Sequence, residues 1–419
     1  MSYFDLNLDL TDEDKAIRDA AHAFAKDVVR PIGIALERMT AQEAVAENSP
    51  VWEFLREAYR LGYHKATLPE AIGGLGMTAM QGHLIMEELF WGSLGLSAIV
   101  LLSTWPFMKV IHTGDQELIN EFVLPFCACN DASIRGCWGI MEPDHGSDHI
   151  GQGEAFYTDP KVKGGVRARL DGDSWVINGE KAAWVSAAPL ATVAMLNVHI
   201  DVSKGLAGGG TCMVPLDLPG VSRGRPLEKV GQRDLPQGAL IFDDVRIPRR
   251  YMFCGPDDYP DWVANNLGFG NTAMSVLALG LARAGFEEAY AYAKTRVQGG
   301  VPLADQYAMK IRIHRMFTKV EAIRAMSRAV WNLTANIYPP LPEYGYAAKI
   351  FCTETAREVI EEAVQIHGAN GLTKEYFIEK IWRDSRALTI EDGVNDVLAR
   401  LGGQILNETF PRTSVNRLA

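Results

Sequence analysis

Two adjacent carboxylates near the C-terminus, Glu391 and Asp392, stand directly before Gly393 and a segment with helical apolar spacing. A carboxylate held in such a turn can act as a general base if it lies within hydrogen-bond reach of a proton on carbon. The same pair could instead cap the following helix, because carboxylates are common helix N-caps. The position therefore predicts either a catalytic base or a helix cap.

The composition is that of an acidic globular protein. The chain has 419 residues, 47% of them hydrophobic and 22% charged, and a formal net charge of -11. This length predicts two or three structural units. The acidic balance argues against nucleic-acid binding, which usually needs a basic face. Residues 1–9 do not resemble a secretory signal, and the most apolar run, residues 94–102, is too short to span a membrane. We therefore expect a cytoplasmic protein.

The six cysteines show no repeated metal-ligand spacing, and Cys127 and Cys129 are too close in sequence for a typical zinc pair. We expect six free, buried thiols and no metal site.

The first third of the chain has the apolar spacing of helices. Thr11, followed by three acidic residues, resembles an N-cap with an acidic first turn. Helical patterns then follow over residues 17–28, 51–61, 80–90 and 97–111, with Pro31 after the first of them.

From about residue 135 the apolar residues alternate, as in strands. Asp171-Gly172 predicts a hairpin turn and Asn178-Gly179 repeats the signal. Strand-like patterns continue over residues 192–200, 211–215 and 239–247. This middle region predicts a small all-β domain.

Past about residue 252 the helical pattern returns, with long apolar faces over residues 272–296, 306–337, 344–366 and 395–406. We predict an α+β multidomain fold. It comprises an N-terminal α-helical domain (1–134), a middle β-barrel-like or sandwich domain (135–251) and a C-terminal four-helix bundle (252–419).

Five short motifs run through the chain. They are Leu68–Gly76, Glu142–Asp148, Ile177–Ser186, Gly231–Arg233 with Phe242–Pro248, and Ala363–Gly371 continuing to Glu379–Asp384. In this order they resemble the motifs of the acyl-CoA dehydrogenase superfamily, and the resemblance covers nearly the whole chain.

The resemblance implies an FAD-dependent α,β-desaturation of an acyl-CoA thioester. In that reaction a carboxylate takes the α-proton while the β-hydrogen leaves as hydride to N5 of FAD. Hydrogen bonds to the thioester oxygen stabilise the charge that develops there. The resemblance also implies an electron-transfer flavoprotein as electron acceptor and a homotetramer built as a dimer of dimers.

Aligning Arg383-Asp384 with the family's Arg-Asp places Asp392, not Glu391, where the catalytic glutamate usually stands. Aspartate is one methylene shorter, so its carboxylate reaches about 1.5 Å less far. Three possibilities remain: Asp392 is the base, Glu391 is the base, or neither is. Some relatives carry the base at the positions of Gly270 and Asn271, where this chain has no carboxylate.

The resemblance also assigns cofactor and substrate contacts. Flavin contacts within one chain fall to Ile140, Met141, Ser147, Trp184, Ser186, Val394 and Asp396, and contacts to the FAD of a neighbouring subunit fall to Arg296, Gln298, Gln365 and Gly368. Substrate contacts fall to Ser147, Trp105 and Gly393. Relatives usually have threonine at Met141, so the flavin contact there must come from the backbone. His145 and His367 are expected to be structural.

The segment expected to line the acyl pocket, residues 91–110, contains no Arg or Lys before Lys109, so a dicarboxylic acyl group lacks an obvious counter-ion. Bulky Trp105 and Phe107 favour a short, branched or cyclic acyl group. Two alternatives stay open. One is a nitroalkane-oxidase-like flavoenzyme with an aspartate base, which would bind no CoA. The other is a non-catalytic scaffold that binds nucleic acid or a partner.

Overall fold

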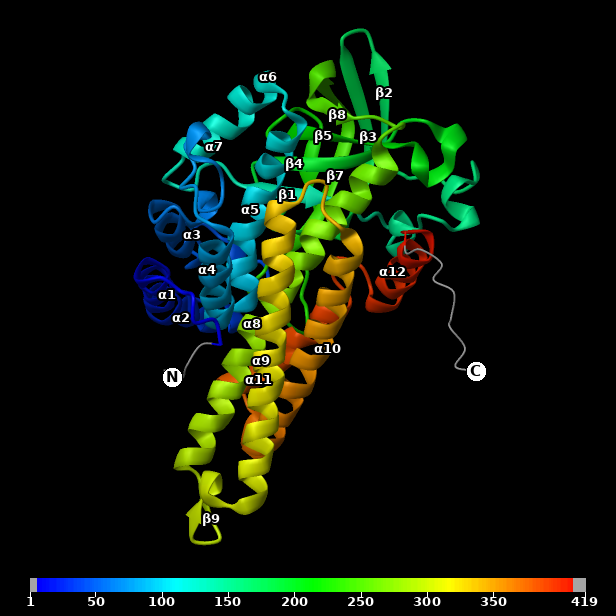
Figure 1. Cartoon of the computed structure of the whole chain (residues 1–419). Coiled ribbons are helices and arrows are strands. Elements are labelled where there is room, and N and C mark those ends of the chain that lie inside the picture. Colours follow the sequence, from blue (N-terminus) through cyan, green and yellow to red (C-terminus); the bar gives the residue numbers. More distant parts are fainter. Residues whose placement is uncertain (1–5, 410–419) are drawn as a thin grey trace, which may run out of the picture.

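The N-terminal region of the computed structural model, which describes residues 6–409, is helical (Figure 1). Its helices are α1 (Asp12–Phe24), η1 (Ala25–Val29), α2 (Arg30–Glu37), α3 (Val51–Arg60), α4 (Ala79–Gly92), α5 (Leu94–Thr113), α6 (Gln116–Leu118), η5 (Ile119–Val123) and α7 (Leu124–Ala128). Thr11 caps α1 as predicted, in a capping box with Asp14. Pro31 does not end the helical run, because the π-helical turn η1 joins α1 to α2.

Helix α5 runs through the centre of this region. Among residues 6–409, α5 is the one helix whose length and apolar composition would allow it to cross a membrane. Its helical length exceeds the apolar run expected from the sequence, yet 72% of its most apolar stretch is buried inside the protein. Such burial is typical of a core helix.

The middle region is an eight-stranded sheet with the strand order β6-β7-β3-β2-β4-β5-β8, and β1 pairs with β4. The strands are β1 (Gly136–Gly139), β2 (Arg167–Asp171), β3 (Ser174–Ser186), β4 (Val193–His199), β5 (Gly209–Pro215), β6 (Val221–Arg223), β7 (Gln237–Pro248) and β8 (Met252–Cys254). A hairpin joins β2 to β3, with Gly172 at φ +61°.

The prediction of a second turn at Asn178-Gly179 is wrong. Both residues lie inside β3, where the register with β7 shifts between Ile177 and Gly179 in a bulge. Gly179 has φ +127°, and a β-carbon there would lie 2.7 Å from the carbonyl oxygen of Gly165. The glycine therefore serves a bulge and a close backbone approach.

The C-terminal region consists of α8 (Tyr259–Thr295), α9 (Tyr307–Asn336), α10 (Pro342–His367), α11 (Phe377–Ser385) and α12 (Asn395–Thr409). Figure 1 shows α8, α9 and α10 as a long bundle below the sheet, with α12 to one side. Helix α8 begins well before the predicted start at Thr272. At Gly280 it approaches α4 closely, since a β-carbon there would lie 2.6 Å from Cβ of Phe90. All six cysteines are free and buried, as predicted.

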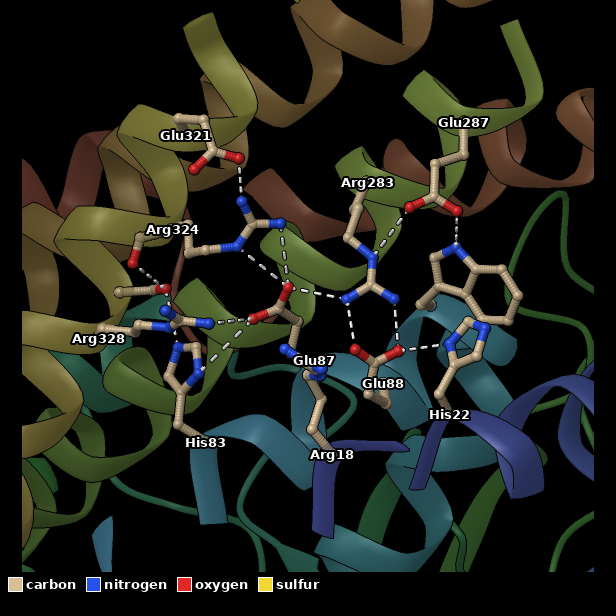
Figure 2. Close-up of polar contacts among 12 residues, drawn as sticks. Arg18, His22, His83, Glu87, Glu88, Arg283, Glu287, Glu321, Arg324 and Arg328 are labelled. Carbon is tan, nitrogen blue, oxygen red and sulfur yellow. Dashed lines mark hydrogen bonds and ion pairs between the residues drawn. The ribbon is translucent and has the colours of Figure 1, made fainter. Parts of the chain in front are cut away.

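A buried network of charges ties α4 to α8 and α9 (Figure 2). At its centre the Glu87 carboxylate accepts hydrogen bonds from Arg283 at 2.8 Å and from Arg324 at 3.2 Å, and it pairs with Arg328 at 3.4 Å. The adjacent Glu88 also binds Arg283. The network therefore fixes how the N-terminal helices sit on the C-terminal bundle.

Candidate active site

The turn that carries Glu391 and Asp392 is held by two long helices. Asn271 of α8 donates a hydrogen bond from Nδ2 to the Asp392 carbonyl oxygen (3.1 Å). Lys349 of α10 donates from Nζ to the Gly393 carbonyl oxygen (2.6 Å). Asp392 has φ +51° and Gly393 has φ +96°. Aspartate tolerates this left-handed conformation at a cost, and such strain persists where the surroundings enforce it.

The two carboxylates point to different surroundings. A β-carbon on Gly270 would lie 3.6 Å from Oδ2 of Asp392 and 3.8 Å from the ring of Trp105. The Asp392 carboxylate therefore faces the space between α5 and α8. Glu391 instead accepts a hydrogen bond at Oε1 from Nε2 of Gln232 (2.8 Å). Within residues 6–409, no hydrogen bond to the Asp392 carboxylate is formed.

Asp392 is exposed to solvent, yet protein atoms surround its carboxylate on most sides. The carboxylate therefore lines a recess that opens to solvent. Burial raises the pKa of Asp392, against the opposing charge of Lys349. Burial also raises the pKa of Glu391 to about 7; the Gln232 hydrogen bond opposes this rise and the Asp392 charge adds to it. A carboxylate with a raised pKa is a stronger base than an ordinary carboxylate, and this suits proton abstraction near neutral pH.

We expect the Glu391→Gln variant to be more stable than the parent at pH 8 and about equally stable at pH 4. The folded-state pKa of Glu391 is about 7 and its ordinary value is 4.5. Between pH 4.5 and about pH 7, the side chain of Glu391 is deprotonated in the unfolded chain but stays protonated in the folded chain. The parent therefore loses stability as the pH rises through this range. The difference at pH 8 should be on the order of 3 kcal/mol. Urea unfolding across this range measures it, and a gap that does not change with pH would contradict the prediction.

The Arg383-Asp384 motif positions the loop that carries Gln232. Asp384 accepts a hydrogen bond from the backbone N–H of Gln232 and pairs with Lys380 at 2.5 Å. Lys380 also pairs with the buried Asp234 at 3.2 Å. A β-carbon on Gly231 would lie 2.3 Å from the Arg383 carbonyl oxygen. The two motifs, far apart in sequence, are thus packed together beside Glu391.

A second segment meets the turn from the β-domain. Lys181 donates from Nζ to the Ile140 carbonyl oxygen (3.0 Å) and to the buried Glu142 carboxylate (2.7 Å), and the Met141 carbonyl oxygen accepts from Ala182. The short helix η6 (Ser147–Ile150) follows. Its last residue packs on the turn, because a β-carbon on Gly393 would lie 3.0 Å from Cδ1 of Ile150. The segment that contains Ile140, Met141 and Ser147 thus leads to Ile150 beside Gly393, while Val394 precedes α12 and Asp396 lies in its first turn.

Trp184 and Ser186 lie at the end of β3. The Trp184 side chain is 58% exposed, which is unusual for so large an apolar group. The Ser186 hydroxyl accepts a hydrogen bond from Nε2 of Gln237 (2.8 Å). Oε1 of Gln237 accepts in turn from Lys229 (2.7 Å), at the start of the loop that carries Gln232. Through this loop Trp184 and Ser186 are connected to Glu391.

The remaining predicted contacts lie at the other end of the bundle. Arg296 follows α8, and Gln298 belongs to the exposed hairpin β9 (Val297–Gln298) and β10 (Val301–Pro302) visible at the tip of Figure 1. Gln365 and Gly368 reach the same end, because His367 stacks on Tyr292 with ring centroids 4.4 Å apart. Along α8 this end is roughly 37 Å from Gly270, at 1.5 Å per residue. Within one chain these four residues do not meet Asp392.

A cavity of about 470 Å³ lies between the N-terminal helices and α8 and α9. Its wall includes Trp105, together with Phe269 and Trp331. Phe107 does not shape this cavity; its ring stacks on Phe126 with centroids 4.0 Å apart in the core.

The two histidines have structural surroundings. His145 hydrogen-bonds through Nδ1 to Asp148 (2.5 Å), and His367 is buried with Nδ1 at 2.8 Å from the Ala363 carbonyl oxygen. The sequence interpretation gave no role in the site to six other residues that build it. They are Glu142, Lys181, Lys229, Gln232, Asn271 and Lys349. For Lys349 a signal existed, because it is a single lysine within an otherwise apolar stretch, Ala347–Phe351.

Three models of one protein family match the chain in succession. The N-terminal domain of acyl-CoA dehydrogenase matches residues 11–129, the middle domain residues 137–245 and the C-terminal domain residues 261–406. The order agrees with the helical, β and helical regions described above.

Individual relatives match over nearly their whole length. A probable acyl-CoA dehydrogenase of Bacillus subtilis, YngJ, is 28% identical over 94% of this chain and 97% of its own. The structure of butyryl-CoA dehydrogenase from Megasphaera elsdenii superposes with a TM-score of 0.84 at 25% identity, covering 96% of this chain and all of its own. A nitroalkane oxidase active-site mutant crystallised with 1-nitrooctane shares the fold, with a TM-score of 0.85 at 20% identity, covering 96% of this chain and 97% of its own. The chain belongs to the acyl-CoA dehydrogenase family, flavoprotein oxidoreductases that act on the CH–CH group of acyl-CoA.

Proposed function

We propose that this protein is an FAD-dependent acyl-CoA dehydrogenase in which Asp392 removes the α-proton of the thioester. One observation carries the proposal: the Asp392 carboxylate faces Gly270 and Trp105, beside the cavity, while Glu391 is bound to Gln232. A base needs a free carboxylate directed at the substrate, and only Asp392 of the pair meets both conditions.

The residues present fit FAD. Trp184 offers an exposed aromatic face at the end of a strand, and Ser186 offers a hydroxyl beside it. The segment from Ile140 to Ser147 would hold the flavin through its backbone, since the Met141 side chain provides no hydroxyl. When bound, FAD would supply the acceptor for the β-hydride.

The chain itself would move the proton and stabilise the developing charge. Asp392 takes the α-proton at its carboxylate. The backbone N–H of Asp392, which donates to no residue within 6–409, is available to the thioester oxygen as in an oxyanion hole. Lys349 and Asn271 keep the turn in place by binding its carbonyl oxygens, so that the shorter aspartate meets the substrate in one fixed geometry.

We further propose a short acyl group, because the bulky Trp105 stands in the cavity wall beside the base. Electrons would leave through an electron-transfer flavoprotein. An aspartate at the base position also favours a second candidate, a nitroalkane oxidase that binds no CoA. Anaerobic mixing of the flavin-loaded protein with short acyl-CoA thioesters or with nitroalkanes separates the two. Bleaching of the flavin band by thioesters supports the dehydrogenase, whereas bleaching only by nitroalkanes would refute it.

We propose that FAD is shared between subunits of a homotetramer, since Arg296, Gln298, Gln365 and Gly368 lie far from Asp392 of the same chain. Arg296→Ala should then weaken FAD binding about 10- to 100-fold, as expected for the loss of a charge-assisted hydrogen bond to phosphate. Flavin retained after dilution and gel filtration measures this. The matched control is Arg312→Ala, which removes a surface arginine paired with Glu362. Equal flavin occupancy in both variants would argue against a shared site.

A further inference from the structure

Lys109 of α5 is a buried lysine without a counter-ion. The residue is 2% exposed, and within residues 6–409 its ammonium group forms neither an ion pair nor a hydrogen bond. The other buried lysines all have partners: Lys181 binds Glu142, Lys349 binds Asn395 and the Gly393 carbonyl, and Lys380 binds Asp234 and Asp384. Burying a charge without a partner is costly, so such a group indicates a ligand that supplies one.

The Lys109 ammonium lies against two aromatic rings of the cavity wall, those of Trp105 and Phe269. Its Nζ is 3.9 Å from the ring centroid of Phe269 and 4.6 Å from that of Trp105, and both rings line the cavity. The far edge of the Trp105 indole reaches the neighbourhood of Gly270 and of the Asp392 carboxylate. Base, indole and ammonium are therefore neighbours in this order, and an acyl group that starts at the base and follows the indole would end near Lys109.

Two neighbouring polar atoms also lack a hydrogen-bond partner. The indole N–H of Trp105 is buried and has no partner, and Nδ1 of His112, one turn beyond Lys109, has none either. The His112 ring stacks on Phe269 with centroids 5.3 Å apart. Burial, and to a lesser extent the Lys109 charge, lowers the pKa of His112 to about 4. The Trp105 indole N–H and the Lys109 ammonium group would both be satisfied by an acceptor.

We propose that Lys109 binds a carboxylate at the far end of the acyl group, so that the substrate is the CoA monothioester of a short dicarboxylic acid. A carboxylate would accept from Nζ of Lys109 and from the Trp105 indole at once. Aromatic rings would exclude water from the pair, which strengthens its attraction. The assignment rests on the proposed acyl-CoA dehydrogenation and names the substrate class for it. Burial holds the pKa of Lys109 well below its usual range, so binding of the anion should be accompanied by proton uptake.

Two thioesters of equal chain length test the proposal, one ending in a carboxylate and one in a methyl group. Each is titrated anaerobically into the flavin-loaded parent, Lys109→Met and the surface control Lys204→Met. We expect the parent to bind and turn over the carboxylated thioester at least tenfold better than the neutral one. Lys109→Met should lose or reverse this ratio and keep its activity on the neutral thioester, and Lys204→Met should behave as the parent. Lys109→Met should also melt no lower than the parent, because it removes a buried polar group that has neither a hydrogen-bond partner nor a counter-ion.

Three results would overturn the assignment. A parent that does not prefer the carboxylated thioester refutes it directly. A Lys109→Met variant that keeps the parent's preference, or that loses activity on both thioesters equally and melts lower, shows a structural lysine. If neither thioester bleaches the parent's flavin, the dehydrogenase proposal itself fails and the Lys109 assignment falls with it. Bleaching by the neutral thioester alone preserves the dehydrogenase and refutes only the assignment to Lys109.

Discussion

Replacing Asp392 with asparagine should abolish reduction of the flavin by substrate while leaving FAD bound. Asparagine keeps the size of the side chain and the backbone contacts to Asn271 and Lys349, but it cannot take up the α-proton. General base catalysis typically contributes about 10²- to 10⁴-fold, and loss of the sole base in the site should reach at least the upper end of that range. Stopped-flow absorbance of the flavin band measures the reductive half-reaction directly.

The neighbouring carboxylate is the matched control. Glu391→Gln should keep most of its activity, since Gln232 can still donate to the new amide oxygen. Because burial raises the pKa of Asp392, kcat/KM in the parent should fall with decreasing pH at values above the ordinary range of aspartate. Glu391→Gln should retain this acid limb. Turnover by Asp392→Asn at the parent's rate would exclude Asp392 as the base, and loss of activity in Glu391→Gln alone would transfer the role to Glu391.

The sequence predicts the order of helical, β and helical regions because each region has its own apolar period. Sequence-based prediction fails where the same dipeptide is compatible with two local structures. Asn178-Gly179 favours a turn in isolation, but the neighbouring strand β7 pairs on both sides of it, and the glycine becomes a bulge. Likewise Pro31 should stop a helix, yet a π-helical turn accommodates its missing N–H. Both outcomes depend on tertiary partners that a local pattern does not contain.

The residues of the site divide in the same way. Asp392 and Trp184 are found as candidate site residues because each lies in a motif that is continuous in sequence. Lys349, Asn271 and Gln232 come from three segments and matter only because the fold brings them to one turn. Lys109 illustrates the limit most clearly. In the sequence it marks only the end of an apolar stretch, and its missing counter-ion becomes visible only when every neighbour is placed.

The largest expected effect on stability comes from Glu87, at the centre of the buried network in Figure 2. Burial alone would raise its pKa, but the charges of Arg324, Arg283 and Arg328 hold the pKa of Glu87 below its usual range. Glu87→Gln removes the charge that these guanidinium groups share. Breaking a buried ion pair from one side typically costs about 3–5 kcal/mol, since a buried charge is left without compensation.

The matched control is Glu57→Gln, which breaks a solvent-exposed pair with Arg60 and should cost far less, because water screens such pairs. The depressed pKa of Glu87 means that its contribution is complete above the ordinary range of glutamate and is lost only as the pH falls towards the folded-state value. The difference in unfolding free energy between the parent and Glu87→Gln should therefore stay constant from pH 8 to pH 5, whereas the Glu391→Gln difference shrinks over the same range. Glu87→Gln unfolding like Glu57→Gln would mean that Glu88 and Glu321 alone compensate the arginines. In that case Glu87 would not be what joins α4 to the C-terminal bundle.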